Sequence, residues 1–532
     1  MSPQDPLSSR PPLGEPLEQA VLTASDLELL ARRGLTVEEV HRQAGLLRDA
    51  PPPVEVLKPA TVGDGIERLT AQQVDSLRQR WRSRDASTAK FVPASGAASR
   101  MFAALIALRQ ALATAGASSA LAREHREIAE LLRRCRDLWP FTLPPPIRGS
   151  DDVARVLDHL LGEEGLGLQH LPKGLLPFHR HPAGPASAFE EQLREGALYL
   201  RGEDSRTRAA LRFHFTVSPE HRDDFARHLE QLRPAIEVAA NASLGVEFSV
   251  QSPATDTVAL DVGGRLARDR LGALLLRPGG HGALLDNLAA ATATADCVFV
   301  KNIDNVLPHD RLDEVVAWKQ VLGGRLLELR ELLHRSLVRL ERALQAVAEP
   351  ALLADEISAV RDDYLRGFGT LPPGLDESAA VGDPERELAR RWIDRLDRPL
   401  RVCGMVRNEG KPGGGPFWVA ERGLQIVESA EIGVDSREVL QRSTHFNPVD
   451  LAVCARDRHG RPYDLHRYVD ARRVFVADKS HDGRPVRALE RPGLWNGAMS
   501  DWNTAFIEVP ASTFAPVKTV FDLVDPAHQP AG

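Results

Sequence analysis

Small residues gather between Pro93 and Arg100, in the segment PASGAASR, directly after the apolar pair Phe91 and Val92. Small side chains let backbone N–H groups approach phosphate oxygens, and the start of the helix expected near Ser99 favours negative charge. The pattern therefore predicts a phosphate-binding loop, with Arg100 able to pair with a phosphate. The alternative is an ordinary tight turn between a strand and a helix that carries a surface arginine. The loop residues assigned to nucleotide binding are Ala94, Ser95, Gly96, Ala97 and Ser99.

One lysine, Lys173, lies between two prolines in the segment LPKGLLP, residues 171–177. A rigid loop of this kind holds an ammonium group at a fixed point, which suits the charge on a triphosphate or on departing pyrophosphate. The segment therefore predicts a second phosphate-binding element. The alternative is a solvated lysine in a proline-rich turn.

The segment RPGGHG, residues 277–282, is rich in glycine. Backbone without side chains would let a planar base or a ribose lie against it, which predicts a nucleotide contact. The alternative is an ordinary flexible loop in which the histidine has a structural role. The residues assigned to this contact are Gly279, Gly280, His281 and Gly282.

An acidic residue, Asp304, follows the compact apolar strand predicted over residues 296–300. In open α/β sheets, ligands bind at the carboxyl ends of the strands. A single carboxylate there can hold Mg²⁺ against a triphosphate, because Mg²⁺ takes its other ligands from phosphate and water. The alternative is a carboxylate that caps a helix or a turn.

The C-terminal part of the chain carries scattered groups that suit a sugar phosphate. Carboxylates and amides hydrogen-bond to sugar hydroxyls, and lysines neutralise a phosphate. Lys518 lies in the closing segment FAPVKT, residues 514–519. The alternatives are a surface residue on an edge strand for Glu428 and a core side chain for Trp495. The residues assigned to the sugar are Glu428, Asn447, Lys479, Trp495 and Asn496.

Strands that alternate with helices indicate the framework that positions these groups. Short strands are predicted near residues 91–92, 212–217, 246–250, 258–261 and 296–300, with helices over 186–200 and after Ser218. We therefore predict an α/β fold with a mostly parallel sheet. From Arg401 the chain becomes rich in strand patterns and glycine, which predicts a small β-rich C-terminal region.

Changes in composition divide the chain into segments. Residues 1–15 are rich in proline and serine and are expected to be disordered. Leucines recur at heptad-like spacing from Leu312 to Val347, and Gly323 and Gly324 interrupt that pattern. The predicted segments are a helical N-terminal extension over 16–85, a nucleotide-binding core over 86–310 with a helical insertion at about 103–165, a helical insertion over 311–398, and a sugar-binding part over 399–532.

The composition describes a chain that can bury a large core. Of 532 residues, 43% are apolar and 27% are charged, and the formal net charge is −7 with no long basic run. These values argue against binding to nucleic acid or to an anionic membrane as the main role, and they leave the oligomeric state open. The cysteines form no C-x-x-C pair, and we find neither a secretory signal nor about 18 consecutive apolar residues. We therefore expect a soluble cytoplasmic enzyme.

Taken in this order, the motifs resemble those of the eukaryotic-type UDP-sugar pyrophosphorylases, which act on glucose 1-phosphate or N-acetylglucosamine 1-phosphate. The resemblance extends over about residues 90–525. More closely, the chain is identified as a member of the bacterial domain of unknown function 4301 family. The pyrophosphorylase resemblance implies a Rossmann-like nucleotidyltransferase core of the glycosyltransferase-A type.

The resemblance assigns roles in nucleotide binding. PASGAASRM and LPKGLLPF are similar to the family's phosphate-binding segments, so Arg100 and Lys173 take those catalytic roles. Gln251 and the glycine-rich turn are similar to a glutamine and a turn that contact the base. Asn302-Ile303-Asp304-Asn305 matches a segment whose aspartate binds the metal, which implies Mg²⁺ as the cofactor.

The resemblance also covers the sugar phosphate. Val427–Glu431 is similar to a sugar-binding strand, and Phe514–Lys518 to a terminal segment whose lysine contacts phosphate. Three departures stand out: Ala97 and Ala98 replace glycines, helices must form an insertion before Lys173, and Ser429-Ala430 replaces a Tyr-Ser pair, so the sugar is left open.

The implied activity is transfer of a nucleotide from a nucleoside triphosphate to a sugar 1-phosphate, with release of pyrophosphate. Uridylyl as the nucleotide is carried by the resemblance alone. One alternative is a glycosyltransferase-like enzyme that uses a nucleotide sugar. The sequence disfavours it, because no Asp-x-Asp pair follows the strand predicted before Asp304. The other is a non-catalytic protein that binds nucleotide or sugar phosphate. The replacement of loop glycines by Ala97 and Ala98 favours this alternative.

Overall fold

The computed structural model describes the chain over most of its length. The described ranges are 22–96, 98–115, 123–202, 208–346, 350–375, 384–408, 414–433 and 436–530. Ala97 of the predicted phosphate loop and the segment 1–15, expected to be disordered, lie outside these ranges.

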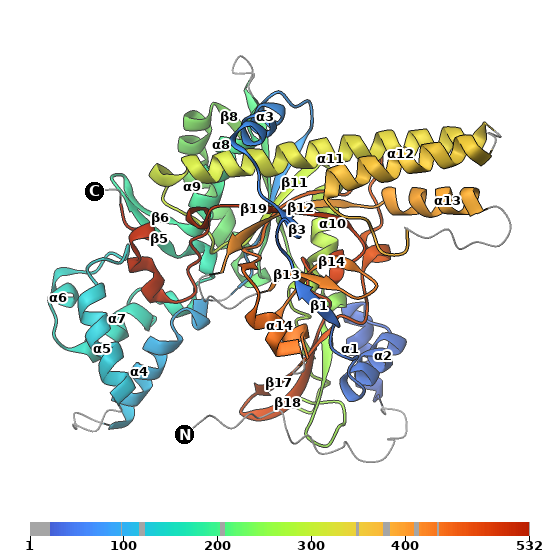
Figure 1. The fold of residues 1–532 in the computed structure, drawn as a ribbon. Helices are drawn as coiled ribbons and strands as arrows, with labels where there is room; N and C mark the ends of the chain where they lie inside the picture. Colours follow the sequence, from blue (N-terminus) through green and yellow to red (C-terminus); the bar gives the residue numbers. More distant parts are fainter. Residues whose placement is uncertain are drawn as a thin grey trace.

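A ten-stranded sheet forms the centre of the molecule (Figure 1). Its strand order is β2-β3-β19-β12-β16-β11-β4-β7-β8, and β15 pairs with β12. Neighbours along this order are parallel, except that β16 runs antiparallel to both β11 and β12. The predicted α/β class with a mostly parallel mixed sheet is confirmed. The strand bounds are β2 Thr61–Val62, β3 Gly65–Glu67, β4 Thr88–Pro93, β7 Ala209–Thr216, β8 Ala242–Ser249, β11 Cys297–Lys301, β12 Leu400–Arg407, β15 His445–Phe446, β16 Asp450–Cys454 and β19 Asn503–Glu508.

Helices cover both faces of this sheet. Successive side chains of a strand point to opposite faces, so Phe91 and Val92 of β4 belong to different hydrophobic clusters. Strands buried on both faces are rich in apolar residues, as in Phe91-Val92 of β4 and Cys297–Val300 of β11, which explains why these strands can be predicted from the sequence. The Phe91 face is covered by α10 (Leu285–Ala293), and the Val92 face by α8 (Ala188–Leu200), α9 (Arg222–Ala240) and α11 (Asp313–Gln345).

A helical arm extends from one side of the molecule (Figure 1). It consists of the outer part of α11 together with α12 (Pro350–Phe368) and α13 (Pro384–Leu396). Buried side chains from all three helices, among them Leu333, Val360 and Trp392, pack together and continue the main core. The leucine pattern over 312–347 therefore serves packing within this chain.

The glycine pair in α11 has a specific packing role. Gly323 and Gly324 interrupt the leucine pattern of the sequence, but α11 itself is continuous through both. A Cβ atom at Gly323 would lie 2.3 Å from the ring of Trp81, and one at Gly324 would lie 2.0 Å from the carbonyl oxygen of Leu77. Both partners belong to α3 (Ala71–Arg82), so the glycines let the two helices cross at close range.

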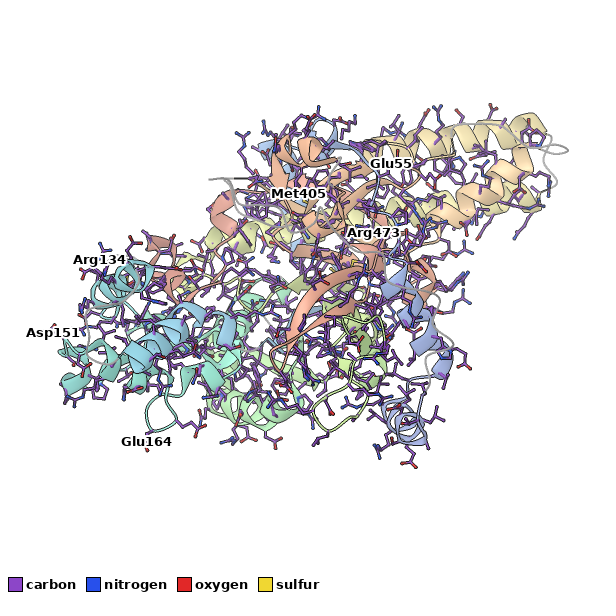
Figure 2. All side chains as sticks on the ribbon, turned by 90° about the horizontal axis from the view of Figure 1, so that it is seen from below. Glu55, Arg134, Asp151, Glu164, Met405 and Arg473 are labelled. Atoms are coloured by element: carbon purple, nitrogen blue, oxygen red, sulfur yellow. The ribbon has the colours of Figure 1, made fainter. Side chains whose placement is uncertain are left out.

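Four helices form a lobe at the opposite side of the molecule (Figure 1). They are α4 (Ala103–Ala115), α5 (Arg123–Cys135), α6 (Pro145–Arg148) and α7 (Val153–Leu161). Figure 2 shows Arg134, Asp151 and Glu164 at this end of the molecule, with Met405 and Arg473 nearer its middle. The chain enters the lobe after β4, and its four helices fall within the segment where we predicted a helical insertion, about 103–165.

The N-terminal segment combines helices with short strands. Helices α1 (Ala24–Arg33) and α2 (Val37–Arg48) begin at Thr23 and Thr36, whose hydroxyl oxygens accept hydrogen bonds from backbone N–H groups of the first turn. Strand β3 then joins the main sheet beside β19. The helical extension is therefore anchored to the core by a strand that the sequence pattern did not indicate.

Smaller sheets complete the fold. Their strand orders are β1-β13-β14, β10-β9-β18-β17 and β5-β6. Among the described residues, no helix is both long enough and apolar enough to cross a membrane. The bounds are β1 Val56–Pro59, β5 Pro177–His181, β6 Gly184–Ser187, β9 Thr257–Leu260, β10 Leu276–Arg277, β13 Gly415–Val419, β14 Gly423–Val427, β17 Phe475–His481 and β18 Arg484–Glu490, together with α14 Arg437–Gln441.

Candidate active site

A cleft with a volume of about 790 Å³ lies where β4, β8 and β11 end. The loops after the carboxyl ends of these strands supply much of its wall, as expected for a ligand site in an open α/β sheet. Its volume falls within the range of about 300–1,000 Å³ that is typical of small-molecule sites. The lining residues are Pro93, Ser95, Gly96, Ser99, Arg100, Met101, Lys173, Gln251, Pro278, Gly280, His281, Leu284, Asn302, Ile303, Asp304, Trp495 and Lys518.

The four charged residues that the sequence singles out, Arg100, Lys173, Asp304 and Lys518, all line this cleft. They come from segments that are remote along the chain. Arg100 ends a short 3-10 turn and is exposed, and its side chain forms no ion pair with any other residue in the described part of the chain. Its guanidinium group is therefore available to an anionic ligand.

The phosphate loop and the lysine segment are joined by backbone hydrogen bonds. The Lys173 N–H donates to the Gly96 carbonyl oxygen at 3.1 Å, and the Ala98 N–H donates to the carbonyl oxygen of Leu171 at 3.3 Å. The Ala94 N–H donates to the Thr216 carbonyl oxygen at 2.8 Å, which continues the β4–β7 pairing beyond the strand. The chain therefore enters and leaves the helical lobe at the same place. The phosphate loop and the lysine segment, far apart in the sequence, are adjacent in the structure.

Gly174 explains why glycine follows the lysine. A Cβ atom at this position would lie 2.8 Å from the ring of Phe225 and 3.3 Å from the Ile303 side chain. A larger residue would therefore push the lysine segment away from the loop that carries Asp304. The proline on the other side, Pro172, fixes the backbone where the turn begins.

The two lysines of the cleft share one carboxylate. Asp304 Oδ2 accepts hydrogen bonds from Lys173 Nζ at 2.8 Å and from Lys518 Nζ at 2.9 Å. The side chains of Lys173 and Asp304 are 13% and 10% exposed, whereas that of Lys518 is 61% exposed. We call Lys173, Asp304 and Lys518 the cleft triad. One of its ammonium groups is buried in the wall, and the other is largely exposed to solvent.

Electrostatics keep Asp304 charged. Burial acts to raise the pKa of the Asp304 carboxyl, but the ammonium groups of Lys173 and Lys518 outweigh it and leave the pKa below its ordinary value. Burial lowers the pKa of Lys173, and Asp304 acts in the opposite direction. Two cations face one anion, so the triad has a net positive charge that suits a phosphate ligand.

The segment that carries Lys518 is docked on the loop that carries Asp304. The Val517 N–H donates to the Asp304 carbonyl oxygen at 3.0 Å, and the Ala515 N–H donates to Asn305 Oδ1 at 3.2 Å. On the other side, the amide of Gln192 in α8 donates to the carbonyl oxygen of Asn302 at 2.8 Å. The segment Asn302–Asn305 is thus held from two directions.

Asp304 has the chemistry to contribute to a Mg²⁺ site. Its second oxygen, Oδ1, is buried and has no hydrogen-bond partner among the described residues. Mg²⁺ is commonly bound through one or two carboxylates together with substrate phosphates. Because two lysines already neutralise this carboxylate, the residues fit an ion that arrives with a polyphosphate better than one held by protein groups alone.

The glycine-rich turn lies against the segment that carries Trp495. Gly280 has φ +75°, and a Cβ atom there would lie 2.7 Å from Glu490 Oε2. The His281 ring stacks on Trp495, with centroids 4.1 Å apart and planes 13° apart. Since the Leu494 N–H donates to His281 Nδ1 at 2.9 Å, the neutral ring carries its proton on Nε2, which lies 3.2 Å from Glu428 Oε1.

Three of the residues assigned to the sugar meet near this stack. They are Trp495, Glu428 and Asn496. Asn496 is buried and donates from Nδ2 to Glu431 Oε2 at 2.8 Å. Trp495 lines the cleft, whereas Glu428 and Asn496 are not among its lining residues. Asn496 Oδ1 has no partner within the described residues.

The other assigned residues lie outside the cleft lining. Lys479 on β17 pairs with Glu490, the residue behind Gly280. Asn447 is buried and accepts a hydrogen bond from the Val449 N–H at 3.1 Å, which stabilises a turn. Gly279 and Gly282 support the glycine-rich turn by close backbone packing, with a Cβ atom at Gly282 only 2.0 Å from the Pro492 carbonyl oxygen.

Sequence reasoning missed residues that support the site. Arg473 is buried and donates to both Glu431 oxygens, at 2.8 and 2.9 Å, and so fixes the end of the segment Val427–Glu431. Nothing in the spacing links Arg473 to this segment. Asn302 also lines the cleft, and its position in the Asn-x-Asp-Asn segment was the available signal.

Comparisons with known proteins give the following similarities. A family model described as a domain of unknown function, DUF4301, matches residues 23–529. One similar solved structure is assigned as a UDP-N-acetylglucosamine pyrophosphorylase from Entamoeba histolytica, with 12% identity, a TM-score of 0.41, and coverage of 87% of this chain and 83% of that chain. Another is the uridine diphosphate N-acetylglucosamine pyrophosphorylase from Trypanosoma brucei in complex with inhibitor, with 15% identity, a TM-score of 0.37, and coverage of 86% and 84%. No curated protein matches the chain.

Proposed function

Because the chain belongs to the family described as a domain of unknown function, DUF4301, we propose its function from the chemistry of its own cleft. It is a nucleotidyltransferase that moves a nucleotide from a nucleoside triphosphate onto a sugar 1-phosphate and releases pyrophosphate. Uridylyl is the nucleotide that the motif resemblance favours. The observation that carries this proposal is the convergence of Arg100, Lys173, Asp304 and Lys518 on one cleft of about 790 Å³.

The reaction is an in-line displacement. An oxygen of the sugar 1-phosphate attacks the α-phosphorus of the triphosphate, the bond from that phosphorus to the bridging oxygen breaks, and pyrophosphate leaves with the electron pair. Such a step needs positioning and charge neutralisation and does not need a covalent residue. Cations in the wall of a partly enclosed cleft meet this need.

The charged residues divide the work. Arg100 and Lys173 neutralise the triphosphate and the departing pyrophosphate, with Lys173 held in place by Asp304. Lys518 is exposed and bonds to the same carboxylate, and its ammonium group would neutralise the incoming sugar phosphate. Mg²⁺ bound with the triphosphate would use Asp304 Oδ1 and supply further charge neutralisation at the phosphates.

The walls on either side suit the base and the sugar. Gln251, Gly280 and His281 line the cleft and offer an amide, bare backbone and a ring to the nucleotide. Trp495 adds an aromatic surface for a sugar face, and Glu428 contacts the His281 ring that stacks on it. Asn496 is bonded to Glu431 in the same wall. Lys479 and Asn447 lie outside the lining, and we assign them indirect roles in shaping this wall.

The decisive experiment measures pyrophosphate release over a panel of nucleoside triphosphates and sugar 1-phosphates in the presence of Mg²⁺. We expect release with at least one pair, and a decrease in kcat/KM of about 100- to 1,000-fold in Arg100→Ala and in Asp304→Ala, since removal of one preorganised group commonly costs that much. Arg227→Ala is the matched control, because that arginine on α9 is 73% exposed and outside the cleft.

Other outcomes would identify a different function. Full activity in both cleft variants would refute the assignment of the site. Triphosphate binding in a thermal-shift screen, without pyrophosphate from any pair, would indicate a non-catalytic binding protein. Sugar transfer from a nucleotide sugar would indicate the glycosyltransferase alternative.

A further inference from the structure

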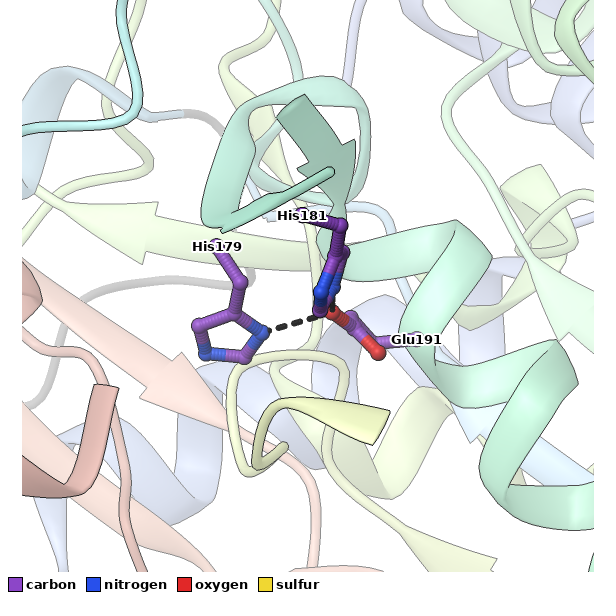
Figure 3. A group of neighbouring side chains, drawn as sticks. All are labelled: His179, His181 and Glu191. Carbon is purple, nitrogen blue, oxygen red and sulfur yellow. Dashed lines mark hydrogen bonds and ion pairs between the residues drawn. The ribbon is translucent and has the colours of Figure 1, made fainter. Parts of the chain in front are cut away.

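A second cluster of potential ligands lies beside the cleft, outside its lining. Figure 3 shows His179 and His181, from the same strand β5, pointing toward Glu191 in the first turn of α8. His179 Nδ1 lies 2.8 Å and His181 Nε2 2.6 Å from the same oxygen, Glu191 Oε1. One ligand atom from each of the three residues lies within 4.8 Å of the other two.

Hydrogen bonding alone leaves this cluster unbalanced. Both histidines converge on Glu191 Oε1, while Glu191 Oε2 is buried without a partner among the described residues. His181 Nε2 also lies 3.2 Å from His309 Nδ1, and these two rings are 3.9 Å apart at their centroids. A single proton on His181 Nε2 cannot serve both neighbours well. Convergence of this kind is expected when the atoms face a common cation.

One spacing in the cluster matches that of neighbouring ligand atoms around a tetrahedral ion. Zn²⁺ binds imidazole nitrogens and carboxylate oxygens at about 2.0–2.2 Å, which gives about 3.3 Å between neighbouring ligand atoms. The 3.2 Å separation of His181 Nε2 and His309 Nδ1 is close to that value. The shorter contacts to Glu191 Oε1 would lengthen slightly around an ion.

Burial favours a closed site. The side chains of His179 and Glu191 are 0% exposed and that of His181 is 9% exposed, whereas His309 is exposed and faces solvent. A buried carboxylate beside two imidazoles needs a compensating charge. Sites with open positions for substrate keep solvent access, whereas structural zinc sites use four protein ligands. The exposed His309 gives an ion a way in and can close the site behind it.

We propose that His179, His181 and Glu191 bind one Zn²⁺ ion, with His309 as the fourth ligand. Two imidazoles and a carboxylate are a recognised ligand set for Zn²⁺, and metal ligands commonly have an outer partner that orients them. His528 has this position, since its Nδ1 lies 2.9 Å from His179 Nε2 and the two rings are stacked. The inference rests on these residues alone and does not depend on the proposed function.

The position of the cluster gives the ion a structural role. His179 and His181 follow Lys173, His309 follows Asp304, and His528 follows Lys518 along the chain. The three segments that carry the cleft triad therefore run directly into the cluster. A Zn²⁺ ion there would link these segments outside the cleft and fix the relative positions of Lys173, Asp304 and Lys518.

The test uses the full-length protein, stripped of metal with a chelator and titrated with Zn²⁺ by calorimetry, with metal analysis after dialysis. We expect one Zn²⁺ per chain and a higher melting temperature in the loaded protein. His181→Gln and Glu191→Gln should lose stoichiometric binding, and His528→Gln should lower the affinity by about 10- to 100-fold. His214→Gln is the matched control, since His214 is 4% exposed and bonds to Ser249, outside the cluster.

Co²⁺ substitution in the wild-type chain keeps the proposal testable even if a variant fails to fold. The visible absorption of tetrahedral Co²⁺ with nitrogen and oxygen ligands would support the site, and the weak spectrum of a six-coordinate ion would overturn it. Absence of stoichiometric Zn²⁺ binding in the wild type would also overturn it, as would wild-type affinity in both His181→Gln and Glu191→Gln. A different transition metal retained by these residues would refute the assignment to Zn²⁺.

Discussion

Two groups of lysines and carboxylates have members that lie three residues apart at the end of β11, Lys301 and Asp304, and they behave differently. Lys301 ends β11 and belongs to an internal network, whereas Asp304, in the loop that follows, belongs to the cleft triad. The internal network consists of Lys90, Glu195, Lys301, Lys319 and Asp450, and we call it the buried network. All five side chains are at most 5% exposed. In the cleft triad, by contrast, Lys518 is 61% exposed.

The buried network joins the layers of the fold. Glu195 of α8 accepts from Lys90 Nζ of β4 at 3.0 Å and from Lys301 Nζ of β11 at 2.6 Å. Lys319 of α11 pairs with Asp450 of β16. Two helices are thereby linked to three neighbouring strands through charges that water does not reach.

Burial changes the ionisation of these groups. Desolvation lowers the pKa of Lys90 to about 7, although Glu195 acts in the opposite direction. Burial acts to raise the pKa of Glu195, but Lys301 and Lys90 outweigh it and hold the pKa at about 2. The comparison shows that similar residue types support structure where no ligand can reach them and are available for binding where a cleft exposes them. It also implies that mutations in the two groups should affect different measurements.

Replacement of Glu195 by glutamine should have the largest effect on stability. It leaves Lys90 and Lys301 without a counter-charge in the interior, and loss of one partner of a buried ion pair costs about 3–5 kcal/mol. The measurement is the free energy of unfolding in urea. Glu130→Gln in α5, where the side chain is 60% exposed, is the matched control and should change by less than about 0.5 kcal/mol. Equal losses in the two variants would contradict the structural role of the buried network.

A pair of lysine variants sharpens the comparison. Lys173→Met should lower kcat/KM for pyrophosphate release by about 100- to 1,000-fold, because a positioned cation is lost from the cleft. It should unfold near the wild-type urea concentration, since Asp304 keeps Lys518 as a partner. Lys301→Met should show the reverse pattern, with low stability and, in the folded fraction, nearly normal kcat/KM. If both variants lose stability and activity to the same extent, the two groups are not functionally distinct.

Acid should weaken the buried network in a defined pH window. The pKa of Glu195 is about 2 in the folded chain, against an ordinary value of 4.5. Between these values the unfolded chain binds more protons at this group, so the free energy of unfolding falls as the pH drops, by at most about 1.4 kcal/mol per pH unit. Glu195→Gln should remove this part of the slope in urea titrations from pH 5 to pH 2. An unchanged slope would show that Glu195 is not the group responsible.

The cleft was more predictable from the sequence than the buried network. Small residues, a lysine between prolines and an aspartate after an apolar strand each leave a local pattern, and the order of parallel strands brings such loops together. Arg100, Lys173 and Asp304 could therefore be predicted from the sequence as candidate cleft residues. Lys479 and Asn447 were assigned from residue type alone, and both lie outside the cleft lining. Residue type without a local pattern was therefore not enough to predict which side chains line the cleft.

Buried polar residues gave no comparable signal. Helix α8 carries Glu191, Gln192 and Glu195 on buried faces, where they contact the histidine cluster, the loop of Asp304 and the buried network, respectively. In the sequence these residues resemble the solvated side of an ordinary helix, because charge usually marks an exposed face. Their burial depends on lysines and histidines from distant strands, and only the tertiary fold reveals those partners.

Lys518→Ala should have the smallest effect and should test whether exposure sets the size of the response. Its side chain is 61% exposed. Exposed ion pairs contribute up to about 1 kcal/mol, which corresponds to about a two- to fivefold loss in kcat/KM. The loss should shrink when the assay is run near 1 M salt, where the screening length falls to about 3 Å. Lys173 is 13% exposed, so the loss in Lys173→Met should persist at that salt concentration. Equal losses in the two variants, with equal dependence on salt, would mean that the ligand encloses both lysines to the same degree and that the cleft closes around its substrate.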